Sequence, residues 1–161
     1  MFGLFRNKKM DLYAPVKGEC IAIEDVPDPV FSNKLLGDGI AFKPLNNTIF
    51  SPCDGTITMV AETKHALGLK AKNGTEIMIH VGLDTVNYNG KGFKCFVSNN
   101  QKVKKGQKLI EVDLDFFRKE NANLTTPMVI ITKDINLTII SNKGIVDNDS
   151  VVVKLGDEMW K

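Results

Sequence analysis

The sequence of 161 residues is poor in features that mark several classes of protein. It has only two histidines and one tryptophan, and no apolar run is long enough to cross a bilayer as a helix. Its formal net charge is +2, without the concentrated positive charge on which nucleic-acid binding depends. Residues 1–9 form too short an apolar block for a secretion signal. We therefore expect a cytoplasmic protein that binds no nucleic acid.

Cysteine is also scarce. The three cysteines, Cys20, Cys53 and Cys95, include no Cys-x-x-Cys pair. An odd number without such a pair indicates neither a disulfide framework nor a zinc knuckle. We expect free thiols and no cofactor held by them.

The length and the apolar content predict one domain. With 43% apolar residues, a chain of 161 residues is long enough to bury a core. We expect a single domain over residues 13–161, preceded by a flexible segment over residues 1–12. Because residues 1–9 mix apolar and basic side chains, a weak contact with a membrane is the alternative for that segment.

Short segments rich in Val, Ile and Thr recur every eight to twelve residues, separated by Gly, Asn, Asp and Pro. This pattern predicts an all-β protein, an antiparallel β-sandwich or barrel-sandwich hybrid. Short helices are expected only over residues 29–36 and 113–121, the second with Asp113 as its N-cap. The expected strands are 19–24, 40–43, 47–50, 55–61, 65–71, 75–81, 94–97, 108–112, 128–132, 136–140 and 150–154.

An internal repeat supports this architecture. Residues 13–18 and 50–55 share the pattern aromatic-x-Pro-x-x-Gly, which indicates that one kind of corner is used twice. Residues 103–109 have the turn-then-strand form of lipoyl carriers, but the sequence contains no lysine in the setting that those carriers modify. The repeat therefore bears on the fold and not on the function.

The two histidines lie on either side of an Asn-Gly pair at 73–74, and such a pair between alternating apolar runs is a strong hairpin signal. A two-residue turn there would set Leu67 opposite His80 and His65 opposite Gly82. Both imidazoles would then share one face as diagonal neighbours, ~7–8 Å apart. A three-residue turn would change the register and separate them.

Two imidazoles on one face allow more than one chemistry. They could bind a metal ion with a third ligand, relay a proton, or hold a phosphoryl group between two ring nitrogens. The spacing alone does not choose among these.

Residues 74–86, Gly-Thr-Glu-Ile-Met-Ile-His-Val-Gly-Leu-Asp-Thr-Val, resemble the active-site signature of the glucose-type enzyme IIA (EIIA) family of the phosphoenolpyruvate-dependent sugar phosphotransferase system. Residues 62–66, Glu-Thr-Lys-His-Ala, are similar to the segment around the auxiliary histidine of that family. Further matches extend the resemblance from about residue 13 to residue 154 and include 23–31, 37–41 and 90–93.

The resemblance implies a role for each residue around the histidines. His80 would carry the phosphoryl group on Nε2, while the Gly82 carbonyl accepts a hydrogen bond from its Nδ1–H. His65 would stabilise the phosphoryl oxygens, and the Thr63 hydroxyl would orient His65. Taken without the family, Thr63 is an ordinary strand residue.

The resemblance also implies the partners. The protein would accept its phosphoryl group from the phosphorylated histidine phosphocarrier protein HPr and pass it to the IIB domain of a glucose-type sugar permease. It would work as a monomer without a cofactor. In the unphosphorylated state it would bind regulated transporters or kinases, because a phosphoryl group changes which partners a surface fits.

A partner-binding rim around the histidines follows from the same resemblance. Acidic side chains at Asp28 and Asp84 would meet a basic residue of HPr. An apolar ring would protect the phosphohistidine from water, although the same residues could equally be core: Val30, Phe31, Ile40 and Met78. The sequence departs from the ring at Ala61 and Leu67, where bacterial relatives often have Phe.

A zinc-dependent peptidase is the main competing class, because His80 and Asp84 have the spacing His-x-x-x-Asp. Such an enzyme needs a further His-x-His pair, which a chain with two histidines cannot provide. We therefore expect no metal centre. A secondary zinc ion held by His65, His80 and a partner's carboxylate is the remaining metal hypothesis.

Overall fold

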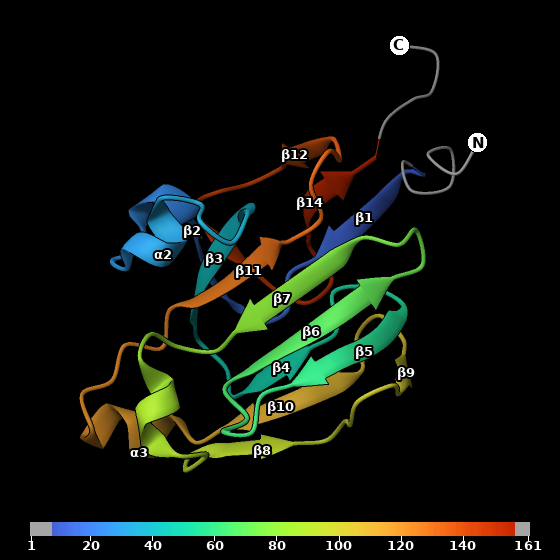
Figure 1. The fold of residues 1–161 in the computed structure, drawn as a ribbon. Helices are drawn as coiled ribbons and strands as arrows, with labels where there is room; N and C mark the ends of the chain where they lie inside the picture. Colours follow the sequence, from blue (N-terminus) through green and yellow to red (C-terminus); the bar gives the residue numbers. More distant parts are fainter. Residues whose placement is uncertain (1–7, 157–161) are drawn as a thin grey trace.

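The computed structural model describes residues 8–156, which form mainly antiparallel strands (Figure 1). The largest sheet has eight strands in the order β13-β2-β3-β11-β7-β6-β5-β9. In chain order these strands are β2 (Gly18–Ala22), β3 (Asp38–Pro44), β5 (Gly55–Val60), β6 (Ala66–Ala71), β7 (Glu76–His80), β9 (Lys102–Val103), β11 (Thr126–Ile130) and β13 (Ile145–Val146).

Two smaller sheets of three strands each complete the architecture, in the orders β1-β14-β12 and β4-β10-β8. Their strands are β1 (Met10–Tyr13), β4 (Thr48–Phe50), β8 (Phe93–Cys95), β10 (Lys108–Val112), β12 (Leu137–Ile139) and β14 (Val151–Leu155). Helical turns are short: η1 (Ile23–Asp25), α2 (Pro29–Ser32), η2 (Thr85–Tyr88) and α3 (Leu114–Lys119). The expected all-β sandwich with one or two short helices is confirmed.

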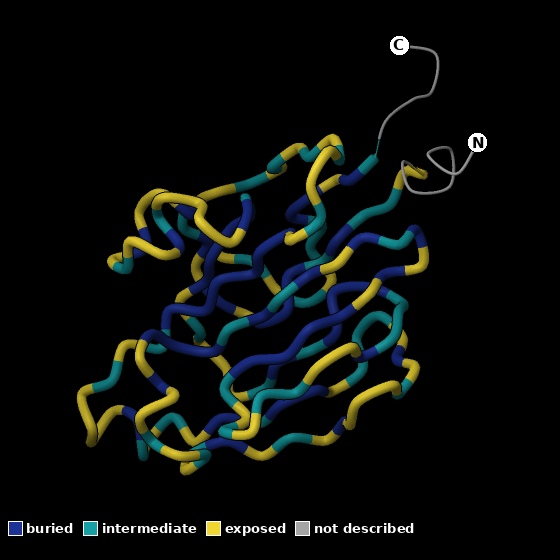
Figure 2. The backbone as a smooth tube through the Cα atoms, in the orientation of Figure 1, coloured by how far each residue is buried: buried dark blue, intermediate teal, exposed yellow. Residues whose placement is uncertain are grey.

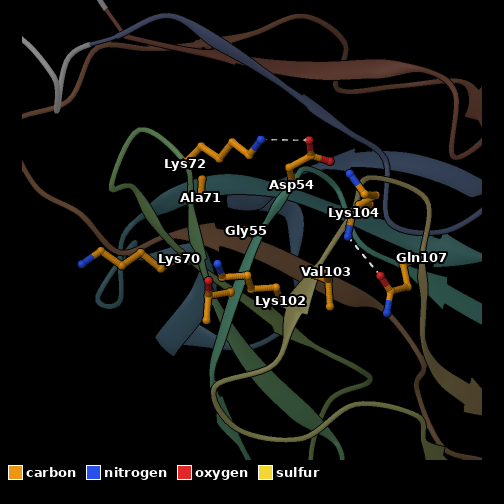
Figure 3. A pocket seen from close by; sticks show the side chains of 10 residues that line it. Asp54, Gly55, Lys70, Ala71, Lys72, Lys102, Val103, Lys104 and Gln107 are labelled. Carbon is orange, nitrogen blue, oxygen red and sulfur yellow. Dashed lines mark hydrogen bonds and ion pairs between the residues drawn. The ribbon is translucent and has the colours of Figure 1, made fainter.

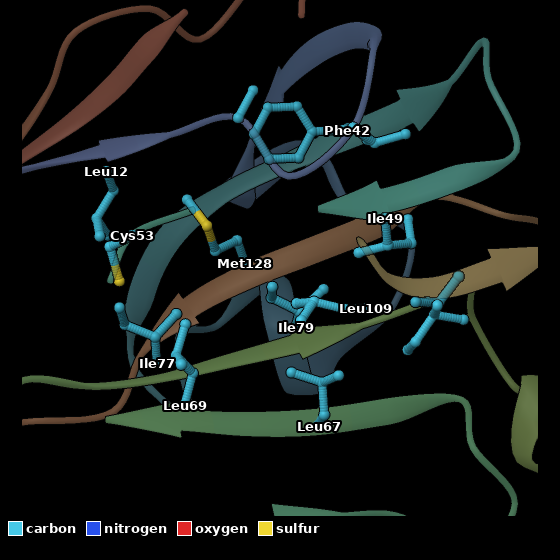
Figure 4. Close-up of a cluster of buried hydrophobic side chains, with 14 of the residues drawn as sticks. Leu12, Phe42, Ile49, Cys53, Leu67, Leu69, Ile77, Ile79, Leu109 and Met128 are labelled. Carbon is cyan, nitrogen blue, oxygen red and sulfur yellow. The ribbon is translucent and has the colours of Figure 1, made fainter. Parts of the chain in front are cut away.

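The core lies between the sheets, where the buried stretches of backbone run along the strands and the exposed stretches lie mostly in the loops (Figure 2). Alternate side chains of a strand point to opposite faces, so β6 and β7 contribute every second residue to this core, Leu67 and Leu69 from β6 and Ile77 and Ile79 from β7. Strands of all three sheets meet there through fully buried side chains, among them Leu12, Phe42, Ile49, Leu67, Ile79 and Leu109 (Figure 4). Each such side chain contributes roughly 1.5–3 kcal/mol of transfer free energy.

The repeated aromatic-x-Pro segments contact one another. The Tyr13 N–H donates to the Pro52 carbonyl at 3.0 Å, and the Phe50 N–H donates to the Pro15 carbonyl at 2.6 Å. The two corners therefore satisfy each other's backbone groups where the chain passes between sheets.

The short helices begin where the sequence predicts and end earlier. Asp28 caps α2 by accepting from the Val30 N–H at 3.0 Å, and Pro29 takes the first helical position. Asp113 caps α3 by accepting from the Phe116 N–H at 3.0 Å, as expected. Neither helix of the described residues is long and apolar enough to cross a membrane.

The expected flexible segment 1–12 extends too far towards the C-terminus, because its last three residues form a strand. Residues 10–12 belong to β1, which pairs with β14, and the Leu12 side chain is fully buried in the core. Burial of this leucine stabilises the strand. The ordered domain therefore begins earlier than the expected start at Tyr13. Residues 1–7, including most of the stretch considered for membrane contact, lie outside the described residues.

The three cysteines are free, as expected. Burial raises the pKa of the Cys20 thiol to about 11 and, with a smaller effect of Asp54, that of Cys53 to about 12. These two thiols therefore behave as small core side chains.

Candidate functional site

The hairpin that carries the histidines has a three-residue loop, 72–74, and not the expected two-residue turn. Ala71 and Thr75 close the loop through a backbone hydrogen bond of 2.8 Å, and only Gly74 takes a positive φ, 90°. The Asn73 side chain explains the difference, because it accepts from the Thr75 N–H and donates to the Lys8 carbonyl. A type I turn followed by a glycine is the usual form of such loops.

The longer loop shifts the register of β6 and β7 by one residue. Ala66 pairs with His80 and Leu67 with Ile79, so the expected pairing of Leu67 with His80 is wrong. In a regular ladder this register would point His65 and His80 to opposite faces.

The imidazoles nevertheless meet, because His65 precedes the regular part of β6. Lys64 has a left-handed backbone with φ of 59°, and β6 begins only at Ala66. The His65 carbonyl accepts from the Val81 N–H at 2.6 Å, which ties this bend to the end of β7. The two ring centroids lie 4.8 Å apart with an interplanar angle of 78°. The predicted proximity is confirmed, although for a different reason.

His80 ends β7, and its ring is fixed by the backbone. Its Nδ1–H donates to the Gly82 carbonyl oxygen at 2.7 Å. Because a carbonyl can only accept, this bond places the proton of the neutral ring on Nδ1 and leaves the Nε2 lone pair available. Gly82 has φ of 85°, a conformation that glycine adopts without strain.

The turn after His80 depends on residues that sequence reasoning did not assign. The buried Thr85 hydroxyl donates to the Val81 carbonyl at 2.5 Å, and a Cβ at position 82 would collide with the Thr85 methyl group. The Asn123 carbonyl accepts from the Leu83 N–H at 2.8 Å. Thr85 could have been noticed as a hydroxyl residue close to the histidine motif, whereas nothing in the sequence brings Asn123 near it.

His65 is held by a side chain. A hydrogen bond of 2.6 Å joins Thr63 Oγ1 and His65 Nδ1, as expected. When the hydroxyl donates in this bond, the proton of neutral His65 lies on Nε2 and is available for donation. In that tautomer the two imidazoles present complementary nitrogens, a nucleophile on His80 and a donor on His65.

Both histidines are neutral at neutral pH. Burial lowers the pKa of His65, with a further contribution from the neighbouring His80. Burial also lowers the pKa of His80, against the opposing effects of the Gly82 hydrogen bond and of the Asp28 and Asp84 charges. A neutral imidazole is the form that can act as a nucleophile.

An apolar cluster lies against His80. The Phe31 ring centroid is 5.2 Å from that of His80, and Phe31 is 4% exposed. Met78 is half-buried against the same cluster, and Val30 is 41% exposed. Ile40 does not belong to this group: it is fully buried in the main core, because β3 points it inward, so the expectation that it contacts a partner is wrong.

The two expected acidic residues lie near His80, since both affect its pKa. Asp84 is exposed and has a left-handed backbone with φ of 59°. Asp28 is half-buried and also caps α2. Their carboxylates add negative potential around a neutral pair of rings.

The described residues offer little to a metal ion, since they contain no group of three or more His, Cys, Asp or Glu side chains placed to hold one. Two imidazoles alone leave an incomplete coordination shell. A zinc ion completed by a partner's carboxylate stays a prediction.

The chain is thus an all-β sandwich whose candidate site is a pair of contacting, neutral histidines. The sequence profile described as "phosphoenolpyruvate-dependent sugar phosphotransferase system, EIIA 1" matches residues 10–135. The chain belongs to this family, and it is a phosphotransferase component that carries phosphoryl groups between proteins.

Individual relatives agree with this assignment. The "PTS system glucose-specific EIIA component" of Bacillus cereus is 45% identical over 146 residues, covering 90% of this chain and 88% of the relative. The protein of that name from Haemophilus influenzae is 40% identical over 158 residues, covering 96% and 95%.

A larger relative and a solved structure extend the comparison. The "PTS system glucose-specific EIICBA component" of Staphylococcus saprophyticus is 37% identical over 153 residues, 95% of this chain and 23% of that protein. The structure of "glucose permease IIA from Mycoplasma capricolum" is similar with a TM-score of 0.85 and 36% identity, covering 91% of this chain and 96% of that one.

Proposed function

We propose that His80 is the phosphorylated residue of this carrier. The observation that carries the proposal is the hydrogen bond from His80 Nδ1–H to the Gly82 carbonyl, which leaves Nε2 as the nucleophile. In the transfer, the N–P bond of the donor phosphohistidine breaks as the bond from His80 Nε2 to phosphorus forms. The second transfer reverses these roles, with His80 as the leaving group.

His65 would stabilise the phosphoryl group during both steps. Its ring contacts that of His80, and the bond to Thr63 lets Nε2–H point a proton at the phosphoryl oxygens. Charge on those oxygens changes most in the loose transition state, so a positioned donor there acts on the rate.

The surroundings of His80 fit a labile phosphohistidine. Phe31 covers one side of the ring, and the partly buried Met78 and the exposed Val30 lie close to this cluster. Apolar side chains that exclude water would slow hydrolysis between the two transfers. Val30 is then free to contact a docked partner.

The partners would be phospho-HPr as donor and a permease IIB domain as acceptor. Relatives named EIICBA carry a matching segment within a longer chain, which supports a IIB acceptor. The names of the relatives favour glucose as the transported sugar. Asp28 and Asp84 would steer a basic surface of HPr to the histidines. We place this monomeric carrier in the cytoplasm, where its unphosphorylated form would also bind regulated transporters or kinases.

Phosphorylation of the purified protein by phosphoenolpyruvate, enzyme I and HPr tests this function. We expect one phosphoryl group that is lost in mild acid and kept in base, because a phosphoramidate hydrolyses in acid whereas serine and threonine esters survive it. Label that survives acid, or no label, would refute the proposal. A metal chelator should leave the transfer unchanged, since the residues proposed here need no zinc ion.

A further inference from the structure

A trough on the outer face of the large sheet, far from the histidines, carries four lysines. Its floor is β5, where Thr56 pairs with Lys70 of β6 on one side and with Lys102 of β9 on the other. Lys72 and Lys104 follow two residues further along the same two segments and share the outer face, while Ala71 and Val103 between them are buried. The trough has a volume of about 630 Å³ (Figure 3).

One carboxylate, Asp54, also lines the trough and offsets part of this positive charge. Lys72 forms an ion pair with Asp54 at 3.6 Å, and Asp54 also accepts from the Lys105 N–H at 2.8 Å. Within residues 8–156 no ion pair involves Lys70, Lys102 or Lys104, although the Lys104 charge helps to lower the pKa of the Asp54 carboxyl. Glu76 of β7 is the cross-strand partner of Lys70 and shares its face of the sheet, so it offsets part of the Lys70 charge from the side opposite β5. An anion in the trough would relieve the repulsion among these cations.

Protection of the sheet edge does not account for all four lysines. β9 is the terminal strand of the large sheet, and lysines on such a strand discourage pairing with other chains. That explains Lys102 and Lys104. Lys70 lies on β6, which has β7 and β5 as neighbours, so no open edge needs it.

The repeat of the lysines indicates the shape of the ligand. Along each segment the two lysines are two residues apart, ~6.6–6.8 Å in an extended chain. The two rows straddle β5, two strand spacings or ~9.5 Å apart at the backbone. An extended polypeptide with acidic side chains at alternate positions has the same repeat, and the floor of Gly55 and Thr56 leaves it room.

We propose that this trough docks an extended acidic segment of a partner protein. The residues that line it include no aromatic side chain on which a base could stack, which disfavours single-stranded nucleic acid. They also include no exposed large apolar side chain that could enter a lipid surface.

The position of the trough allows two partners at once. Lys70 lies at one end of β6, and the bend that carries His65 precedes the other end, so about 15 Å of strand separates them. A protein held in the trough would leave the imidazoles accessible. The docking proposal stands independently of the role given to His80.

Fluorescence anisotropy with a labelled, acetylated octapeptide of alternating Glu and Thr tests the proposal, using the full-length protein at low ionic strength. The double variant Lys70→Gln and Lys102→Gln should bind about fivefold more weakly, because two exposed ion pairs are lost. The matched control Lys91→Gln and Lys133→Gln removes the same charge at exposed sites outside the trough and should bind like the wild type. All four side chains are exposed, so the variants should keep the wild-type melting temperature.

The alternatives give different results. An equal loss in both double variants would show attraction to net charge alone and would overturn the site. Tighter binding of a thymidine oligonucleotide, or of vesicles containing phosphatidylserine, than of the peptide would assign the lysines to another ligand. Absence of peptide binding at low salt would end the proposal. In each case His80 labelling can be measured separately, so the two proposals fail independently.

Discussion

His80 and His65 have ring centroids only 4.8 Å apart, but the fold holds them in different ways. His80 ends a regular strand, and a backbone carbonyl fixes its tautomer. His65 lies on a bend before its strand, and a side-chain hydroxyl contacts its ring. A carbonyl can only accept, whereas a hydroxyl can donate or accept, so the first ring is committed to one tautomer and the second is adaptable. This difference matches a nucleophile and an assisting donor.

Removal of the nucleophile should have the largest effect. His80→Ala takes away the only nitrogen proposed to form the bond to phosphorus, so labelling by phospho-HPr should be abolished. The measurement is incorporation of label after gel separation. The side chain is only partly buried, and an unchanged melting curve would exclude unfolding as the cause. Label on the variant would place the phosphoryl group elsewhere.

Replacement of the assisting histidine should separate the two transfers. His65→Gln keeps an N–H donor near the phosphoryl group, so the variant should still accept label. Onward transfer to a IIB domain should slow by ~10²–10³, the usual cost of losing one preorganised donor. Rapid-quench kinetics of both steps would measure this. Onward transfer at the wild-type rate would remove His65 from the proposed mechanism.

A smaller effect should follow from loosening the turn behind His80. Thr85→Val has nearly the same shape but lacks the hydroxyl that donates to the Val81 carbonyl. If that bond keeps the Gly82 carbonyl aimed at His80, acceptance of the phosphoryl group should fall about tenfold, equivalent to ~1.4 kcal/mol in the barrier. Thr85→Ser restores the donor and should restore the rate.

If Thr85 only supported the backbone of the turn, its replacement would not change the tautomer of His80. We therefore expect the ¹⁵N shifts of His80 to show a mixture of tautomers in Thr85→Val and one tautomer in Thr85→Ser. A wild-type spectrum for Thr85→Val would mean that the Thr85 hydroxyl does not hold the His80 tautomer.

The sequence was a good guide to elements and a poor guide to register. Alternation of apolar residues predicted most strands, because burial of one face decides them. It did not predict β9 and β13, which have two residues each and carry little pattern, nor β1, most of which falls in the segment expected to be flexible. The Asn73–Gly74 turn was misread because the Asn73 side chain bonds to Lys8 and Thr75, and a contact with a residue 65 positions away leaves no local signal.

In the site too, features with a local sequence signal were predicted and features set by the tertiary fold were not. The resemblance around His80 and His65 led to the correct hydrogen bonds of Gly82 and Thr63, since these partners are two residues away in sequence. Ile40 was misassigned because an apolar residue on a buried strand has no mark that separates rim from core. Asn123 was missed because only the tertiary fold brings its carbonyl to Leu83.

The smallest predicted effects concern the protonation of the pair. Both pKa values are lowered, so both histidines should titrate below their ordinary value of 6.5 in ¹H–¹⁵N spectra. Since protonation then favours the unfolded chain, their contribution to stability is complete above pH 6.5 and is lost as the pH falls through the lowered values. A variant lacking both rings should lose less stability than the wild type over that range.

Asp84→Asn should sharpen the contrast between the rings. The Asp84 carboxylate favours the protonated form of His80, and it is not among the groups that shift His65. Its neutralisation should lower the His80 midpoint further while the His65 midpoint moves little. The matched control Glu120→Gln neutralises an exposed carboxylate that affects neither ring, and both midpoints should stay in place. Equal shifts of the two midpoints in Asp84→Asn would show that the two rings titrate as one unit. In that case the electrostatic surroundings would not explain why His80 and His65 have different roles.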